Sequence, residues 1–180
     1  VGIAITTQPP RLDLRAGDPD ATVSDDLASG GYSGSSGGVI PWAGDWMESD
    51  PEGGVQDATQ GDVQITNVAG SNRIVLGDQG SDTGGTASAR AAIWRSVDLS
   101  QHINAILSFD LSSSGNLENQ DLYVVEVSRD GGATFAVLRS YQNDVTSAES
   151  LSLSGYESAS TVIRFRLNSN FAAGELVYID

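Results

Sequence analysis

Few residues of this chain are equipped for acid–base or nucleophilic catalysis. His102 is the only histidine, there is no cysteine, and the G-x-S-x-G match over 34–38 lies in a Gly/Ser-rich loop rather than at a strand-to-helix turn that presents a serine nucleophile. A Ser–His–Asp triad needs such a presented serine, while thiol catalysis and zinc–thiolate sites need cysteine. A pair of carboxylates would serve a glycosidase, but nothing among the 24 acidic residues singles out one pair with a raised pKa. The sequence therefore favours binding or structure over catalysis.

The aromatic residues are the side chains best suited to hold a ligand. Trp42, Trp46 and Trp94, with Tyr32 and Tyr156, suggest carbohydrate binding, because an aromatic face stacks on a pyranose ring. The alternative is that they belong to the core, and the apolar segments around Trp46 and Trp94 favour this for those two. Trp42 lies between a proline and a nearby glycine, which predicts partial exposure and makes it the ligand-binding candidate.

Two arginines form a second candidate site. Arg164 and Arg166 alternate with apolar residues and so share one face of a predicted strand. Glu126 and Asp110 are expected opposite them on neighbouring strands. The four residues would line a concave ligand-binding face or form a solvated ion-pair ladder on the outside of a sandwich, and the pattern favours the ladder.

A turn motif lies between two predicted strands. The segment S-R-D-G-G-A-T-F over 128–135 matches the Asp-box pattern S-x-D-x-G-x-T-W/F, with Phe for Trp. We expect Asp130 to accept hydrogen bonds from backbone N–H groups, while Gly131 and Gly132 adopt positive φ. The chain has one such box, which predicts a structural hairpin.

Short apolar runs separated by turn residues predict an all-β fold. We expect strands near 39–48, 62–67, 72–77, 87–97, 103–112, 121–128, 134–141, 148–154, 160–168 and 175–180. Apolar side chains alternate with polar ones, as in half-buried antiparallel strands, so Leu107, Val125 and Phe165 should lie between two layers. Many short strands with regular turns indicate a β-sandwich.

The first 24 residues differ from the rest. Residues 1–7 predict a short strand, Pro9 and Pro10 end it, and the stretch that follows is polar and acidic, like a linker. We therefore expect an N-terminal strand and linker over 1–24, and the sandwich over 25–180.

The charge limits the possible partners. The 24 acidic residues outweigh the 9 basic ones, all arginine, for a net charge of −15. Such a chain repels phosphate backbones and anionic lipid headgroups, which disfavours nucleic acid and membrane surfaces. No apolar run reaches the roughly 18–20 residues that span a bilayer, so membrane insertion is not expected.

The order of segments resembles the MAM-like and carbohydrate-binding-module-like jelly-roll modules of bacterial and archaeal surface proteins and adhesins. The resemblance covers 25–180 and is carried by P-W-A-G-D-W-M-E-S-D over 41–50, L-S-Q-H-I-N-A-I-L-S-F-D-L over 99–111, the Asp box and the terminal G-E-L-V-Y-I-D. It implies an antiparallel jelly-roll β-sandwich.

The same resemblance implies a structural calcium ion. Calcium takes six to eight hard oxygens, which carboxylates and loop carbonyls supply. The positions that match its ligands are Glu48 and Asp50, with Asp180 on the last strand; Asp26 and Asp45 are further candidates. The alternative is that a chain with 24 carboxylates contains acidic clusters by chance.

These observations lead to three hypotheses about function. The first is a non-catalytic, secreted or cell-surface binding or adhesion module, stabilised by calcium, with glycans as candidate ligands. The second is a structural subunit of a surface layer or filament, which pairs with neighbouring surface-protein subunits by adding its N-terminal strand to their sheets. The third is a binding domain from a secreted glycosidase or protease.

Overall fold

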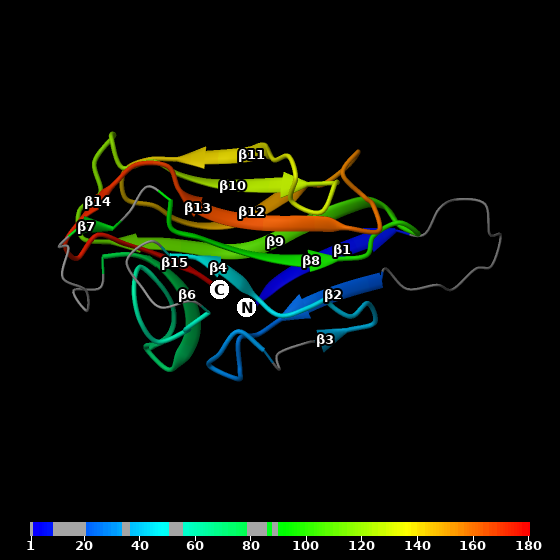
Figure 1. Cartoon of the computed structure of the whole chain (residues 1–180), viewed down its shortest axis with the longest axis horizontal. Coiled ribbons are helices and arrows are strands. Elements are labelled where there is room, and N and C mark those ends of the chain that lie inside the picture. The colour runs from blue at the N-terminus through cyan, green and yellow to red at the C-terminus, as the bar shows by residue number, and fades with distance from the viewer. Residues whose placement is uncertain (1, 9–20, 34–36, 51–55, 79–85, 88–89) are drawn as a thin grey trace.

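A computed structural model describes residues 2–8, 21–33, 37–50, 56–78, 86–87 and 90–180. Within them two antiparallel sheets pack face to face as a sandwich, with a small two-stranded sheet at one end (Figure 1). The described residues contain no helix of the length and apolar character that a membrane span requires. The predicted all-β sandwich is confirmed.

The larger sheet has eight strands and the smaller one five. The larger sheet contains β1 (Ile3–Gln8), β2 (Ala21–Asp25), β3 (Gly37–Gly38), β5 (Val63–Val68), β6 (Ser71–Gly77), β9 (Ile103–Ser114), β12 (Thr146–Ser152) and β15 (Leu176–Ile179). The smaller sheet has the order β11 (Ala136–Tyr141), β10 (Tyr123–Ser128), β13 (Thr161–Leu167), β8 (Ala92–Val97) and β4 (Met47–Ser49). The two-stranded sheet pairs β7 (Thr86–Ala87) with β14 (Phe171–Ala172).

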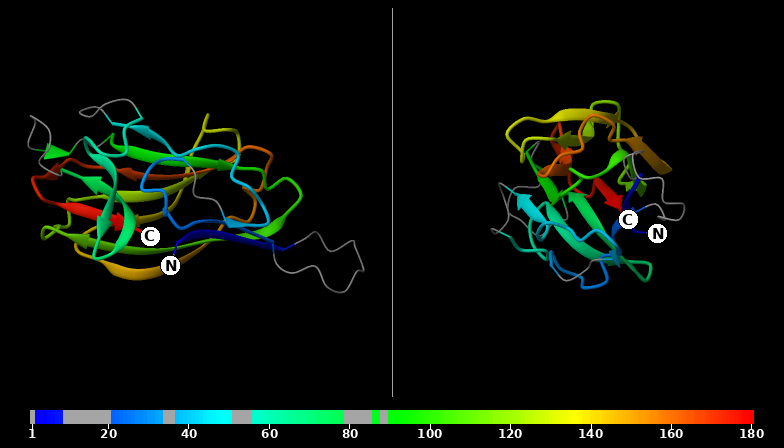
Figure 2. Two further views of the ribbon diagram at one scale, coloured as in Figure 1. Left: turned by 90° about the horizontal axis from the view of Figure 1, so that it is seen from below. Right: turned by 90° about the vertical axis from the view of Figure 1, so that its right-hand side faces the viewer.

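The long strand β9 brings the two ends of the chain together. β1 pairs with residues 103–108 of β9 and β15 with residues 111–114. β12 pairs along 106–112, overlapping both, so it occupies the opposite edge. β1 and β15 therefore lie end to end along one edge of β9, and the N and C marks lie side by side in every view (Figures 1 and 2).

This arrangement corrects the expectation for the N-terminal strand. β1 is not detached from the sandwich, because β2 pairs with one of its edges and β9 with the other. Assembly through this strand would require it to leave both partners. Residues 21–24 of β2 fall within the predicted linker, of which residues 9–20 lie outside the described residues.

The core lies between the inner faces of the two sheets. Leu107, Val125 and Phe165 are at most 2% exposed, as their alternation predicts. Phe165 contacts Phe109 edge-on, with ring centroids 5.2 Å apart, and Trp46 at 6.5 Å. These contacts join both sheets to the segment before β4, so burial of apolar surface is the main force that holds the sandwich together.

The prediction of one strand over 39–48 is wrong. Only Met47–Ser49 pairs as a strand with β8, and Trp42 forms an isolated bridge with Val97. The segment between them carries Gly44, whose flexibility favours a turn over a continuous strand.

Candidate functional site

The two predicted arginines lie on the outer face of the five-stranded sheet. Glu126 accepts a hydrogen bond from Arg164 Nε at 2.7 Å and two from Arg166, from Nε at 3.1 Å and Nη2 at 3.0 Å. Glu126 is only 4% exposed. Burial alone would raise the pKa of Glu126, but the bonds from Arg166 and Arg164 hold that pKa below its usual value. The carboxylate therefore stays ionised and fixes both guanidinium groups.

The predicted ladder thus has Glu126 at its centre but not Asp110. Glu126 pairs directly with Arg164 across β10 and β13. Asp110 belongs to β9, in the other sheet. Strand alternation correctly predicts that Asp110 points outward. The alternation pattern carries no information on which sheet a strand joins.

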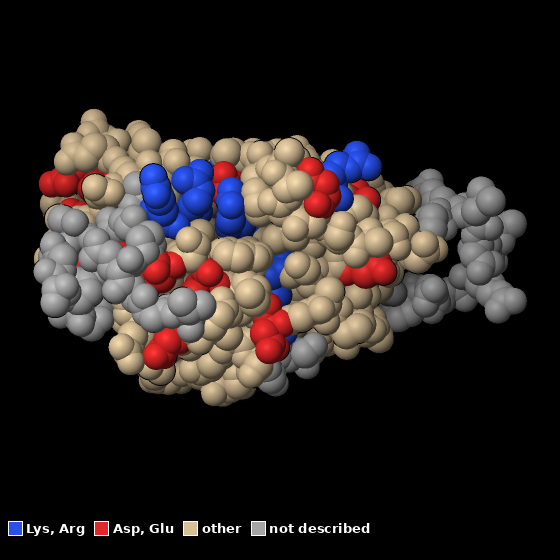
Figure 3. Space-filling model, viewed as in Figure 1, with Lys and Arg blue, Asp and Glu red and all other residues tan. Residues whose placement is uncertain are grey.

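One row of side chains crosses all five strands at this level. Directly opposed residues of antiparallel strands point to the same side, and the pairing runs Met47, Trp94, Arg164, Glu126 and Val137. Trp94 is half-buried and the two edge residues are exposed. Figure 3 shows a group of basic side chains on one part of the surface, with separate acidic side chains elsewhere in the same view. We call Met47, Trp94, Glu126, Arg164 and Arg166 the Trp94 face.

The Asp-box turn supports one edge of this face. Asp130 accepts hydrogen bonds from the Ser128 hydroxyl at 2.6 Å and from the Thr134 N–H at 2.9 Å. The Ser128 and Thr134 hydroxyls and the Thr134 N–H lower the pKa of Asp130 to about 2. Gly131 and Gly132 have φ of 75° and 92°, as the turn requires. The turn positions Phe135 against Arg164, with the ring centroid 3.4 Å from the guanidinium carbon.

The other two tryptophans are buried, and so the predicted roles of Trp42 and Trp94 are exchanged. Trp42 is 7% exposed and donates from Nε1 to the Ser24 carbonyl at 3.1 Å, while Trp46 is fully buried. Trp94 is the partly exposed one. Strand alternation carries the signal, because Ile93 and Val97 face inward and Trp94 must face outward.

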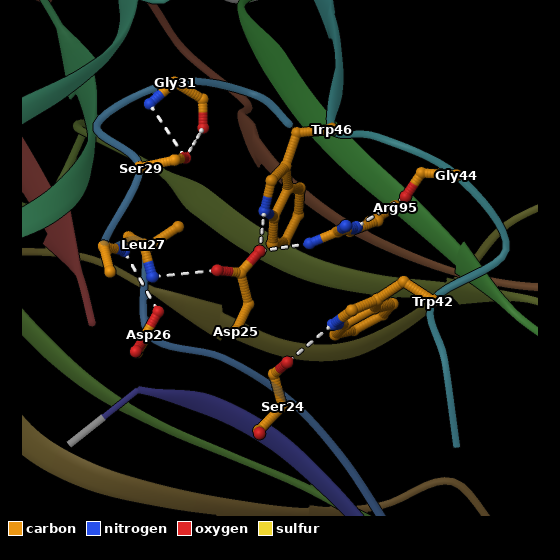
Figure 4. Close-up of polar contacts among 11 residues, drawn as sticks. Ser24, Asp25, Asp26, Leu27, Ser29, Gly31, Trp42, Gly44, Trp46 and Arg95 are labelled. Atoms are coloured by element: carbon orange, nitrogen blue, oxygen red, sulfur yellow. Dashed lines mark hydrogen bonds and ion pairs between the residues drawn. The ribbon is translucent and has the colours of Figure 1, made fainter. Parts of the chain in front are cut away.

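Trp42 and Trp46 enclose a buried ion pair (Figure 4). Asp25 accepts a charge-assisted hydrogen bond from Arg95 and one from Trp46 Nε1 at 2.8 Å. The Arg95 guanidinium carbon lies 5.0 Å from the Trp42 ring and 5.8 Å from the Trp46 ring. Burial raises the pKa of Asp25, while the Leu27 N–H, Trp46 and Arg95 act against that rise. The cluster is closed and its role is structural.

The predicted calcium ligands Glu48, Asp50 and Asp180 do not form a group of three described carboxylates whose oxygens all lie within 4.8 Å of one another. Glu48 accepts the Tyr32 hydroxyl, and Asp50 accepts the backbone N–H of Asp62 at 2.6 Å. Asp180 lies instead beside Arg73, with its Oδ2 3.9 Å from the Arg73 Nε. Asp26 caps a turn through the Ala28 N–H and Asp45 is exposed.

A different set of carboxylates is close enough to share one ion. Among the described residues, Glu118, Asp121 and Glu175 each place an oxygen within 4.8 Å of the others. Asp121 and Glu175 are 3% and 6% exposed. Glu118 is exposed, but local desolvation and the neighbouring Asp121 and Glu175 carboxylates raise its pKa. Sequence reasoning missed this cluster because Glu175 is far along the chain from the other two.

The single histidine, His102, contacts a residue of the neighbouring strand β1. His102 Nδ1 lies 3.0 Å from the Thr7 hydroxyl, which bonds also to the Ala21 carbonyl. This contact ties the start of β9 to β1.

The fold is similar to that of a solved adhesin domain. The K3 cleaved adhesin domain of Lys-gingipain from Porphyromonas gingivalis W83 superposes with a TM-score of 0.57 and 11% sequence identity, covering 87% of this chain and 94% of that domain. The chain has a jelly-roll fold similar to that of this domain. At this identity the likeness shows the fold alone.

Two other solved structures give lower TM-scores. The K2 cleaved adhesin domain of Lys-gingipain has a TM-score of 0.48 and 14% identity, covering 83% of this chain and 92% of that domain. TmCBM61 in complex with β-1,4-galactotriose has a TM-score of 0.48 and 13% identity, covering 87% of this chain and 90% of that chain. No protein-family model and no curated protein matches the sequence.

Proposed function

We propose that this jelly roll is a non-catalytic module of a secreted or cell-surface protein, and that it binds glycans through the Trp94 face. The observation that carries the proposal is the half-buried Trp94 ring beside two arginines whose positions are fixed by Glu126. A sugar ring stacks on such an indole through its C–H groups, while guanidinium N–H groups donate to hydroxyl or carboxylate oxygens.

The two arginines have different roles in this proposal. Arg166 has its nitrogens engaged, two with Glu126 and Nη1 with the Leu167 carbonyl and Asn168 Oδ1. Arg164 bonds to Glu126 through Nε, and within the described part of the chain its Nη groups make no hydrogen bond. Arg164 is therefore the donor to the ligand, and Arg166 keeps Glu126 and the surface in place.

Substitution of Trp94 tests this function. Binding of soluble galactan, glucan, mannan and polygalacturonate is measured for the wild type, and the best polymer is carried to the variants. We expect Trp94→Ala and Arg164→Ala each to weaken binding about tenfold or more, because each removes a central contact. Ile106→Ala, at an exposed position of the other sheet, should bind like the wild type. Retained affinity in Trp94→Ala, or no binding of any polymer by the wild type, would reject the proposal.

We propose further that the Glu118, Asp121 and Glu175 cluster holds a structural calcium ion. Asp121 Oδ2 accepts the Glu118 N–H at 2.6 Å and Glu175 Oε2 accepts the Ala172 N–H at 2.5 Å, which orients both carboxylates. A cation relieves the mutual repulsion that raises the pKa of Glu118. The remaining calcium ligands would be waters or carbonyl oxygens.

The calcium proposal predicts a melting temperature that depends on the ion. An ion that binds only the folded state at about 100 times its Kd adds about 2.7 kcal/mol, which is roughly 5–10 °C for a chain of this size. We expect excess chelator to remove that gain and Asp121→Asn to abolish the response. Asp50→Asn should keep the response to calcium. If this variant loses the response instead, the ligand set that the resemblance implies, Glu48, Asp50 and Asp180, is favoured. An unchanged melt with chelator contradicts calcium binding.

A further inference from the structure

A hollow opens on the outer face of the eight-stranded sheet. It has a volume of about 470 Å³ and lies over β9 and β15, between β12 and β6. This volume is within the range of small-molecule pockets. The side chains that give it its chemistry are Arg73, Asp110, Ser112, Thr146, Tyr178 and Asp180.

The strand register explains why this part of the sheet is hollowed. Ser112 stands directly opposite Tyr178 on one side and Thr146 on the other. Asp110 is opposite Ala148, and its backbone exchanges hydrogen bonds with Asp180 at 2.7 and 3.0 Å. Small side chains therefore form the floor, while the larger Tyr178 stands at the wall, with its hydroxyl held 3.0 Å from the Ser114 hydroxyl.

The polar groups around the hollow are suited to a polyhydroxylated ligand. Arg73 Nε is buried, makes no hydrogen bond among the described residues, and lies 3.9 Å from Asp180 Oδ2. Asp110 supplies a carboxylate acceptor, and Ser112 and Thr146 supply hydroxyls. Adjacent sugar hydroxyls donate to carboxylates and accept from guanidinium groups, while the Tyr178 ring offers an apolar wall.

The charge of the hollow selects the class of sugar. Among the described side chains that line the hollow, the carboxylates of Asp110 and Asp180 outnumber the single guanidinium of Arg73, in a chain of net charge −15. An acidic sugar would be repelled. On the Trp94 face the balance is reversed, with Arg164 and Arg166 around the single carboxylate of Glu126.

We infer that this hollow is a second ligand site, which takes a neutral saccharide. The hollow and the Trp94 face lie on the outer sides of different sheets of the sandwich. Since the proposed function places a glycan on the Trp94 face, the module would hold two glycans on opposite sides. Such a module bridges two polymer chains, and avidity strengthens weak contacts at each site.

The test uses neutral monosaccharides that are too small to reach from one sheet to the other. Methyl β-galactoside, methyl β-glucoside and methyl α-mannoside are titrated into the isotope-labelled chain, and amide shifts are followed by NMR. We expect at least one of them to shift amides of β9, β12 and β15 around the hollow. Asp110→Asn should weaken that binding about tenfold, since it replaces a charge-assisted acceptor. Ala148→Phe, which fills the space and keeps every polar group, should abolish it.

The controls separate this inference from the proposed function. Asp98→Asn removes an exposed carboxylate outside the hollow and should bind the sugar like the wild type. Trp94→Ala should keep the monosaccharide shifts at the hollow even where it loses the polymer. If no neutral glycoside shifts the hollow amides, or if Asp110→Asn and Ala148→Phe bind unchanged, the second site is rejected whether or not the Trp94 face binds a glycan.

Discussion

Replacement of Arg95 by alanine should lower the free energy of unfolding by about 3–5 kcal/mol, because it leaves a buried carboxylate without its counter-charge. The Arg95 and Asp25 side chains are 4% and 1% exposed. The arginine also donates from Nε to the Gly44 carbonyl at 2.7 Å and lies against two indole rings. Its loss therefore disturbs β2, β8 and the segment before β4 together.

Chemical denaturation of matched variants measures this effect. Arg139→Ala removes a pair with Glu149 whose side chains are 51% and 7% exposed, and it should cost less than Arg95→Ala because this arginine is largely in solvent. The double variant Asp25→Asn with Arg95→Met should recover part of the loss, because no uncompensated charge remains. An Arg95→Ala chain as stable as Arg139→Ala would show that the pair is not buried as described.

Replacement of Phe165 by alanine should cost about 3–5 kcal/mol, the range for deletion of a buried aromatic ring from a close-packed core. The ring is 2% exposed and contacts Phe109 of the other sheet and Trp46. It also lies in the centre of β13, between β10 and β8. The cavity would thus open where the two sheets meet.

The matched control for this variant is Val137→Ala. Val137 is 54% exposed on edge strand β11, and its truncation should change stability by no more than about 0.5 kcal/mol. Urea unfolding curves with equal slopes would attribute the difference to stability rather than to a change in the unfolded state. Similar midpoints for Phe165→Ala and Val137→Ala would contradict the sandwich core.

Strand alternation in the sequence identified the strands that are buried on one face. β9 and β13 lie where their apolar periodicity predicts, because a half-buried strand alternates, and β10 also lies where predicted although all six of its residues are buried. β2 was missed since its short segment contains one large apolar residue, Val23, amid polar and acidic neighbours. Asp25 is stabilised there by Arg95, 70 residues later, and no local pattern reports such a partner.

The Trp94 face was predictable in part, because strand alternation shows which side chains share a face. The alternation placed Arg164 and Arg166 on one face and Glu126 opposite, because cross-strand neighbours follow from adjacent strands. For Trp94 the apolar segment around it predicts a core position, whereas strand alternation predicts an outward one, and the structure agrees with the alternation. The carboxylates of Glu118 and Glu175 meet only through the packing of two distant loops, which spacing along the chain does not encode.

The central claim is that the Trp94 face receives the glycan, and the three indole N–H signals of the chain test it most directly. Trp42 and Trp46 donate to Ser24 and Asp25 inside the protein, whereas Trp94 is half-buried on the outer face. When the polymer that binds best is titrated into the ¹⁵N-labelled chain, the Trp94 indole signal should shift and the other two should stay in place. A polymer that binds while the Trp94 signal remains unmoved would contradict the account.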